Sequence, residues 1–96
     1  MEGLTSLFNE GTLKVLSYLG EHEKAYVTQL QEDLSISYET IYRARKRLDK
    51  FGLIELDEGE GGRGSKNWFY LNEKGKKIFD LIKSIEKVVE ESAPQI

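Results

Sequence analysis

The fold is decided by residues 28–53, TQLQEDLSISYETIYRARKRLDKFGL, which predict two helices separated by a tight turn. Thr28 and Gln31 have the spacing of a capping box, in which side chains satisfy free backbone amides at a helix start. Leu30 and Leu34, four residues apart, give the following helix one apolar stripe. We therefore expect a short helix that begins at Thr28 and buries one side.

The second of these helices has signals at both ends. Ile36 lies in the turn and fills the gap between the helices, and Ser37 is placed to cap the second helix. That helix is expected to run to about Phe51. Gly52 suits the left-handed position that ends many helices, and Leu53 is placed for the accompanying hydrophobic contact.

The residues that follow predict a hairpin and a last helix. Residues 53–57 and 66–71 have the composition of strands, and the glycine-rich loop 58–65 joins them. Asn72 is expected to cap a helix over residues 73–91. Helices together with one small sheet make an α+β fold.

The N-terminal part predicts one more helix, over residues 9–20, with Leu13, Leu16 and Leu19 at helical spacing. A polar break follows, and residues 25–27 predict a very short strand. Three apolar residues before this helix are expected to pack against the domain or a partner subunit: Leu4, Leu7 and Phe8.

The length of 96 residues fits one domain, with residues 8–72 as the helix-turn-helix and hairpin unit and residues 73–92 as the last helix. The 39% of hydrophobic residues suffice for one core. No apolar run approaches the ~18 residues of a membrane span, and the first residues do not resemble a secretory signal. Because the chain also has no cysteine, we expect a cytoplasmic protein without disulfides or thiolate metal sites.

The formal net charge of −3 is unevenly distributed along the chain. Residues 38–51 carry five basic side chains against two acidic ones, whereas the segments on either side are net acidic. Exposed charges act over about 10 Å at moderate salt. A partner at this helix therefore meets a local positive charge, which favours a polyanion such as DNA.

A helical projection of residues 38–51 separates an apolar face from a basic face. The apolar face consists of Ile41, Ala44, Leu48 and Phe51. In helix-turn-helix docking, the N-terminal part of the second helix reaches base edges and its flanks meet phosphates. The candidate base readers are Tyr38, Thr40, Tyr42 and Arg43, beside Ser37. The candidate phosphate contacts are Arg45, Lys46, Arg47 and Lys50. Arg43 is the best single candidate because a guanidinium can pair bidentately with guanine; the alternative is an ordinary solvated basic face.

The glycine-rich loop contains a false nucleotide motif. Residues 59–64 match G-x-G-x-x-G, but that motif needs a helix directly after it, and the residues here predict a strand. We therefore reject a dinucleotide site and interpret the loop as a hairpin tip. Arg63 and Lys66 can then reach the DNA backbone or the minor groove; the alternative is a surface loop without that role. Within the second strand, Phe69 and Leu71 are expected to face the core.

The last helix carries an apolar stripe with near-heptad spacing. The stripe consists of Ile78, Leu81, Ile82, Ile85, Val88 and Val89. A helix of ~19 residues is about 28 Å long, more than so small a domain can cover. We expect the distal half to pack against a second copy in a two-fold homodimer; the alternative is that the stripe closes the monomer core.

Two segments resemble the helix-turn-helix core of winged-helix transcriptional regulators: SISYETIYR (35–43) and LDKFGLI (48–54). The segment FYLNEKG (69–75) is similar to the Y-x-L-T-x-x-G ending of the wing in the MarR and PadR groups, with Asn72 where Thr is commoner. The resemblance covers about residues 10–80 and implies a homodimeric repressor or activator on pseudo-palindromic DNA. The chain departs from MarR proteins in lacking their extra N-terminal helix, and from metal-sensing relatives in lacking Cys and His ligands.

Together these features predict a winged helix-turn-helix protein that binds double-stranded DNA sequence-specifically as a homodimer. The helix of residues 38–51 would lie in the major groove. The alternative function is a winged-helix module for protein–protein assembly, which the acidic balance favours. With one histidine and no cysteine, we expect neither an enzyme nor a cofactor or metal site. The sequence leaves open whether a small-molecule effector exists.

Overall fold

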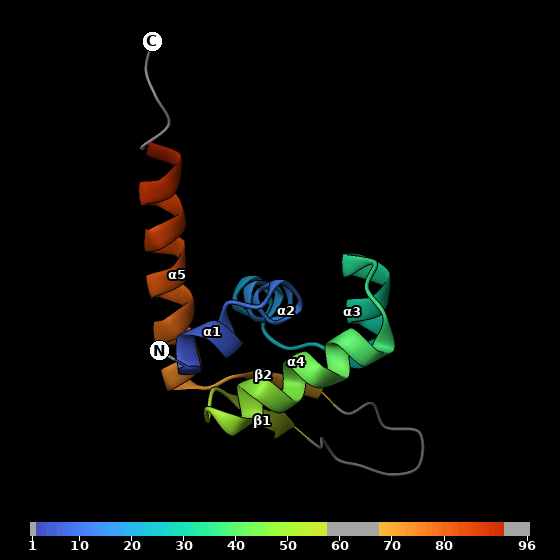
Figure 1. The fold of residues 1–96 in the computed structure, drawn as a ribbon. Coiled ribbons are helices and arrows are strands. Elements are labelled where there is room, and N and C mark those ends of the chain that lie inside the picture. Colours follow the sequence, from blue (N-terminus) through green and yellow to red (C-terminus); the bar gives the residue numbers. More distant parts are fainter. Residues whose placement is uncertain (1, 58–67, 92–96) are drawn as a thin grey trace.

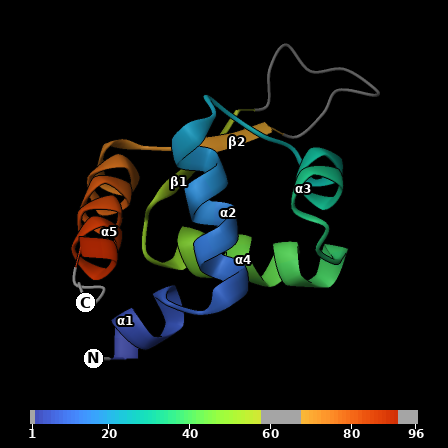
Figure 2. The same cartoon turned by 90° about the horizontal axis from the view of Figure 1, so that it is seen from above.

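The computed structural model describes residues 2–57 and 68–91, which form an α+β fold. The elements in chain order are α1 (Glu2–Leu7), α2 (Glu10–Glu21), α3 (Val27–Leu34), α4 (Tyr38–Lys50), β1 (Ile54–Asp57), β2 (Trp68–Leu71) and α5 (Glu73–Glu91). Helix α5 stands at one side and projects away from the other elements (Figure 1). Seen from above, α2 lies across α4 and between α3 and α5 (Figure 2).

The hydrophobic core forms where α2 crosses α4. Val15 and Leu16 of α2 and Leu48 of α4 are fully buried, and Phe69 of β2 is buried with them. Each such side chain contributes roughly 1.5–3 kcal/mol by leaving water. This burial fixes the inner face of α4 on α2, so that the opposite face of α4 points to solvent.

The N-cap of helix α3 lies two residues before the predicted cap, Thr28. Its N-cap is Tyr26, whose backbone N–H donates to Gln29 Oε1 at 3.4 Å. The predicted capping box of Thr28 and Gln31 is therefore wrong, because both residues lie inside the helix. The physical reason is tertiary: Ala25 is paired to β2, so the chain leaves the sheet there and enters the helix at once.

The turn between α3 and α4 forms as predicted. Ser35 ends α3 in the left-handed conformation, with φ 54°. Ile36 packs against the core. Ser37 caps α4, because its Oγ accepts a hydrogen bond from the Thr40 backbone N–H at 3.1 Å.

The predicted stop of α4 at Gly52 is confirmed. Gly52 has φ +69°, and its N–H donates to the Asp49 carbonyl at 2.9 Å. The N–H of Leu53 donates to the Leu48 carbonyl at 3.0 Å. This pair of bonds is a Schellman motif, which directs the chain from α4 into β1.

The two strands pair antiparallel, with Ile54 opposite Leu71. Ala25 forms an isolated bridge to Phe69, where the sequence predicts a very short strand. Phe69 and Leu71 are buried, so the predicted alternation along β2 is confirmed. The glycine-rich loop predicted between the strands lies outside the described residues.

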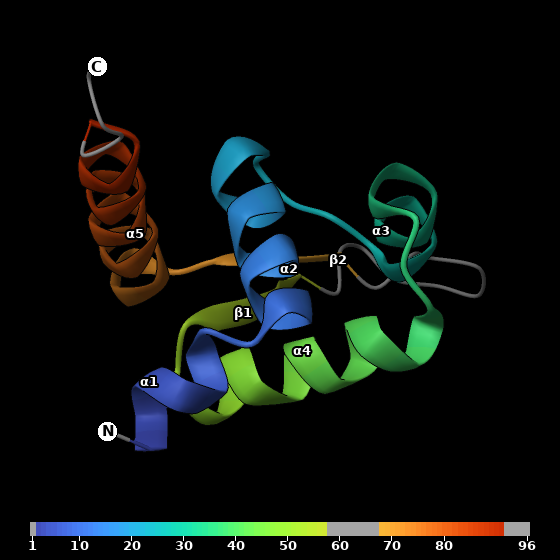
Figure 3. The ribbon, with the colours of Figure 1, turned by 45° about the horizontal axis from the view of Figure 1, so that its top comes forward.

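A short helix, α1, precedes α2, contrary to the expectation that the chain lacks an N-terminal helix. Helix α1 lies beside the C-terminal end of α4 (Figure 3). Leu7 is buried, and Gly3 lies against the Phe51 ring. Leu4 and Phe8 are exposed at 45% and 44%. The segment therefore packs on its own domain through Leu7 and leaves its other two apolar side chains at the surface.

Helix α5 is anchored through its first two turns. Asn72 caps it as predicted, because its Oδ1 accepts a hydrogen bond from the Gly75 N–H at 2.9 Å. A side chain at position 75 would collide with the Leu53 carbonyl, and one at Gly20 of α2 would collide with the Phe79 ring. These close approaches hold the start of α5 against the sheet and α2.

The apolar stripe of α5 divides into two parts. Ile78 and Ile82 are half-buried against the domain's own core, so for these two positions the stripe does close the monomer. The other members are exposed at 49% to 63%: Leu81, Ile85, Val88 and Val89. The distal half of α5 thus presents aliphatic side chains to solvent.

Candidate nucleic-acid interface

The outward face of α4 carries most of the residues predicted to contact DNA. The exposed members of the predicted set are Ser37, Tyr38, Tyr42, Arg43, Lys46 and Lys50. The half-buried members are Thr40, Arg45 and Arg47. The predicted set therefore divides into side chains free to meet a partner and side chains that the domain already holds.

Three of the exposed residues form a ladder along α4. The rings of Tyr38 and Tyr42 are nearly parallel, at 8°, with centroids 6.2 Å apart. Lys46 Nζ lies 5.3 Å from the Tyr42 centroid, within cation–π range. The ladder places two aromatic rings at the N-terminal end of the helix and a positive charge behind them.

Arg43 is paired within its own helix. Its Nη2 lies 3.5 Å from Glu39 Oε1, one turn earlier, and both side chains are exposed. Such exposed pairs are worth about 0.3–0.5 kcal/mol. The guanidinium is thus loosely held and can exchange Glu39 for another acceptor at small cost.

Thr40 and Arg47 face the domain rather than solvent. Thr40 Oγ1 lies 2.9 Å from Ser37 Oγ, and its methyl group packs toward Gly11 of α2. Arg47 Nη1 donates to Oγ1 of the fully buried Thr12 at 3.3 Å. Both side chains therefore serve the contact between α4 and α2.

Arg45 lies on the margin of α4 nearest the hairpin. Its guanidinium carbon lies 5.4 Å from the centroid of Phe69 on β2, a stacked position that favours arginine. Lys50 is exposed at the other end of the helix. Arg63 and Lys66, predicted for the hairpin tip, lie outside the described residues.

The position of α3 beside α4 is held in part by Tyr18 of α2. The Tyr18 hydroxyl donates to Asp33 Oδ2 at 2.5 Å, and the ring stacks on His22 at 3.9 Å. Burial, and then the hydrogen bond and charge of Asp33, raise the pKa of Tyr18 to about 12. The neutral phenol therefore ties α3 to α2 at all ordinary pH values.

A cluster at the root of the hairpin was not predicted from the sequence. Lys24 Nζ lies 3.2 Å from Asp57 Oδ2 of β1 and 4.9 Å from the centroid of the Trp68 ring on β2. The Tyr26 ring meets Trp68 edge-on at 4.7 Å. The cluster joins both strands to the start of α3, so the direction of the hairpin is set by the helix-turn-helix unit.

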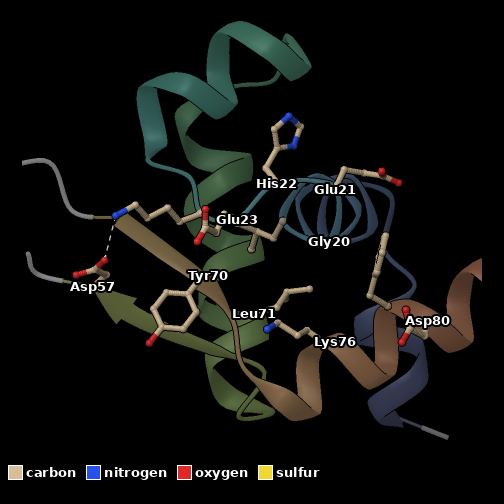
Figure 4. A pocket seen from close by; sticks show the side chains of 12 residues that line it. Gly20, Glu21, His22, Glu23, Asp57, Tyr70, Leu71, Lys76 and Asp80 are labelled. Carbon is tan, nitrogen blue, oxygen red and sulfur yellow. Dashed lines mark hydrogen bonds and ion pairs between the residues drawn. The ribbon is translucent and has the colours of Figure 1, made fainter.

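A groove of about 850 Å³ lies between the end of α2, the root of the hairpin and α5 (Figure 4). Leu19, Leu71 and Phe79 supply its apolar lining. Its charged lining residues are Glu21, Glu23, Lys24, Asp57, Lys76 and Asp80. None of the described residues that line it belongs to α4. The groove is therefore separate from the outward face of α4 and has charges of both signs.

Two other kinds of site are absent from residues 2–57 and 68–91. No group of three or more His, Asp or Glu side chains in these ranges is arranged to hold a metal ion. No helix in the same ranges combines the length and apolar character that crossing a membrane requires.

No family model and no curated protein sequence matches this chain. Solved structures do match it. A MarR family regulator from Neisseria meningitidis has 28% identity and a TM-score of 0.70, with 88% of this chain and 59% of that one covered. A PadR family transcription regulator from Clostridium difficile has 18% identity and a TM-score of 0.73, with 86% and 93% covered. This chain has the winged helix-turn-helix fold of the MarR- and PadR-type regulators.

The winged helix extends over nearly the whole of some neighbours and part of others. A transcriptional regulator homologue from Pyrococcus horikoshii OT3 is covered over 97% of its length and covers 95% of this chain, with 19% identity and a TM-score of 0.74. The chain spans only about three-fifths of the Neisseria regulator. In this fold α3 and α4 are the two helices of the helix-turn-helix, and β1 and β2 are the stem of the wing.

Proposed function

We propose that the protein is a transcriptional regulator that binds double-stranded DNA sequence-specifically as a homodimer. Helix α4 lies in the major groove, and the wing meets the backbone or the minor groove. The observation that carries this proposal is the outward face of α4, which is basic in an otherwise acidic chain. Arg43, Lys46 and Lys50 are exposed on it beside two aromatic rings.

The homodimer is supported by the distal half of α5. Four aliphatic side chains of one stripe are exposed on a helix that projects from the domain (Figure 1). A soluble single domain rarely leaves such a stripe open. A second copy is the natural partner, because a two-fold axis along the stripe pairs identical aliphatic surfaces. Two copies of α4 would then read two half-sites of pseudo-palindromic DNA.

The proposal is tested by selecting bound duplexes from a randomised library and titrating salt by fluorescence anisotropy. We expect Arg43→Ala to reduce the preference for the selected duplex over random duplex, because a base contact discriminates by about 1–3 kcal/mol. Lys46→Ala should weaken binding to all duplexes alike and lower the salt slope by about one. Lys87→Ala, which removes the same charge from an exposed position on α5, is the matched control and should change neither quantity.

The alternative, a winged-helix module for protein assembly, gives a different result. It predicts no binding to random genomic duplex even at about 50 mM salt, where phosphate contacts are strongest. Equal losses on every duplex for Arg43→Ala and Lys46→Ala would instead contradict the division between base reading and phosphate contact.

A further inference from the structure

The N-terminal half of α4, where a recognition helix reaches base edges, presents both polar groups and aromatic rings. Thr40 is turned toward α2 and bonded to Ser37. Arg43 is shared with Glu39. Tyr38 and Tyr42 are exposed at 57% and 47%, next to the exposed ion pair of Glu39 and Arg43. The apolar part of the surface that this end of α4 presents is therefore aromatic.

The two rings are held in a fixed arrangement. Their centroid separation of 6.2 Å matches the ~6 Å rise of four helical residues, so the two rings follow one another along the helix axis. The Lys46 ammonium covers Tyr42 from the next turn. Long side chains on a helix lean toward its N-terminus, which carries both rings toward the base-reading end.

The major groove offers such rings one apolar group. Base edges there present hydrogen-bond donors and acceptors, except at the C5 position of pyrimidines, where thymine carries a methyl group. The same methyl is present in 5-methylcytosine. An aromatic ring that contacts this methyl gains by removing it from water, while a base without it leaves the ring exposed to solvent.

We propose that Tyr38 and Tyr42 read C5-methyl groups of pyrimidines in the major groove. This inference rests on the proposed function, and it names the chemistry that the site selects. Burying one methyl is worth ~0.8 kcal/mol, which is about fourfold in Kd. Because base pairs rise ~3.4 Å along each strand, rings 6.2 Å apart suit methyl groups one or two steps from one another.

The experiment uses the full chain and a duplex recovered from the randomised library. Each thymine is replaced singly by deoxyuridine, which removes only the methyl group, and Kd is measured by anisotropy. We expect about a fourfold loss at one or two positions in each half-site. In the Tyr38→Ala or Tyr42→Ala protein, replacing thymine by deoxyuridine at the corresponding position should no longer reduce the affinity, because the ring that contacts the methyl group is absent.

Tyr38→Phe and Tyr42→Phe are the matched controls, because they keep the ring and remove only the hydroxyl. They should retain the full sensitivity to deoxyuridine, and thermal unfolding by circular dichroism should show all four proteins folded. A Phe variant as insensitive as the Ala variant would mean that the hydroxyl, rather than the ring, makes the contact, and would overturn the proposal.

Further duplexes distinguish thymine from 5-methylcytosine as the source of the methyl group. They also distinguish failure of methyl reading from failure of DNA binding. Placing 5-methylcytosine at a sensitive position should restore affinity relative to cytosine if the rings read the methyl alone; no recovery would overturn that reading. A duplex that binds tightly yet ignores every deoxyuridine replacement would overturn methyl reading and leave DNA binding intact. Absence of binding to any duplex would instead remove the proposed function itself, and the inference with it.

Discussion

Helices α4 and α5 each leave one face uncovered, and the two faces have different chemistry. The open face of α4 carries tyrosines, basic groups and one acidic partner, whereas the open face of distal α5 carries only aliphatic side chains along its stripe. Charged and aromatic groups suit a polyanion with polar edges. Aliphatic groups have no such use and gain only by leaving water. One molecule thus presents two surfaces that favour two different partners.

The inner faces of these helices differ as well. Helix α4 is buried against α2 along its length, through Ile41, Ala44 and Leu48. Helix α5 is held along its first half, by the close approach at Gly75, by buried Phe79 and by half-buried Ile82. An ion pair between Lys83 and Glu21 of α2 adds to this contact. A surface on a fully supported helix is rigid enough to read base edges. A surface on a projecting helix can instead join two domains, which agrees with the proposed dimer through α5.

The largest effect is expected from Ile85→Glu, at the centre of the exposed α5 stripe. Two copies of this charge would face each other in the dimer, so the protein should sediment as a monomer. Affinity for a duplex with two half-sites should fall by about a hundredfold or more, because the second half-site is no longer held close. Sedimentation equilibrium and anisotropy measure the two quantities.

Lys87→Gln is the matched control for that substitution. It makes the same change in charge two residues along α5, at an exposed position off the stripe. We expect it to remain dimeric with unchanged affinity. If Ile85→Glu also remained dimeric, the α5 stripe would not be the dimer interface. The proposed role of α5 as the surface that binds a second copy would then be wrong.

Much of this arrangement can be predicted from local sequence patterns. Gly52 and Asn72 act through hydrogen bonds to residues a few positions away, so their roles follow from spacing alone. The inner face of α4 follows from helical periodicity for the same reason. The structure confirms these predictions from neighbours in sequence, whereas the local capping box of Thr28 and Gln31 is wrong.

The remaining features depend on contacts between distant segments. A helical projection places Thr40 and Arg47 on the margin of α4, but it does not contain α2, which crosses that margin and takes both side chains. Pairing of Ala25 with β2 moves the start of α3 in the same way. Lys24 and Asp57 are 33 positions apart in the sequence, so no local pattern predicts their contact.

The second largest effect is expected at the joint between the two helices. Asn72 caps α5, and its Nδ2 donates to the Gly52 carbonyl at 2.8 Å, just beyond the end of α4, and to Glu55 Oε2 of β1 at 3.0 Å. Asn72→Ala removes all three hydrogen bonds and should lower the free energy of unfolding by about 1–2 kcal/mol. Urea denaturation measures the change. Asn72→Ser keeps a capping oxygen but not the amide, so it should lose only part of that stability; equal losses would show that the cap contributes nothing.

The third largest effect is expected at the contact between α3 and α2, which lies on the side of α4 away from α5. Tyr18→Phe removes the hydrogen bond to Asp33 and should cost about 1 kcal/mol near neutral pH. The pKa of Tyr18 is raised to about 12 in the fold, from about 10 when unfolded. Its contribution is therefore complete below pH 10 and is lost as the pH rises from about 10 toward 12. Denaturation at stepwise alkaline pH should show this loss in the wild type and a smaller one in Tyr18→Phe; parallel curves would contradict the assignment.

The smallest effect is expected from Glu39→Gln. Together with a control on α5, this substitution tests whether DNA affinity depends on a charge on α4 or on the net charge of the chain. The substitution frees Arg43 from its ion pair and removes a negative charge from the face of α4 that we propose binds DNA. An exposed pair is worth at most about 1 kcal/mol, so affinity for duplex DNA should rise two- to fivefold, more at low salt than at high salt.

Glu90→Gln makes the same change on exposed distal α5 and should leave DNA affinity unaltered. A gain in both variants would mean that DNA responds to the net charge of the whole chain, whereas a gain confined to Glu39→Gln locates the response on α4.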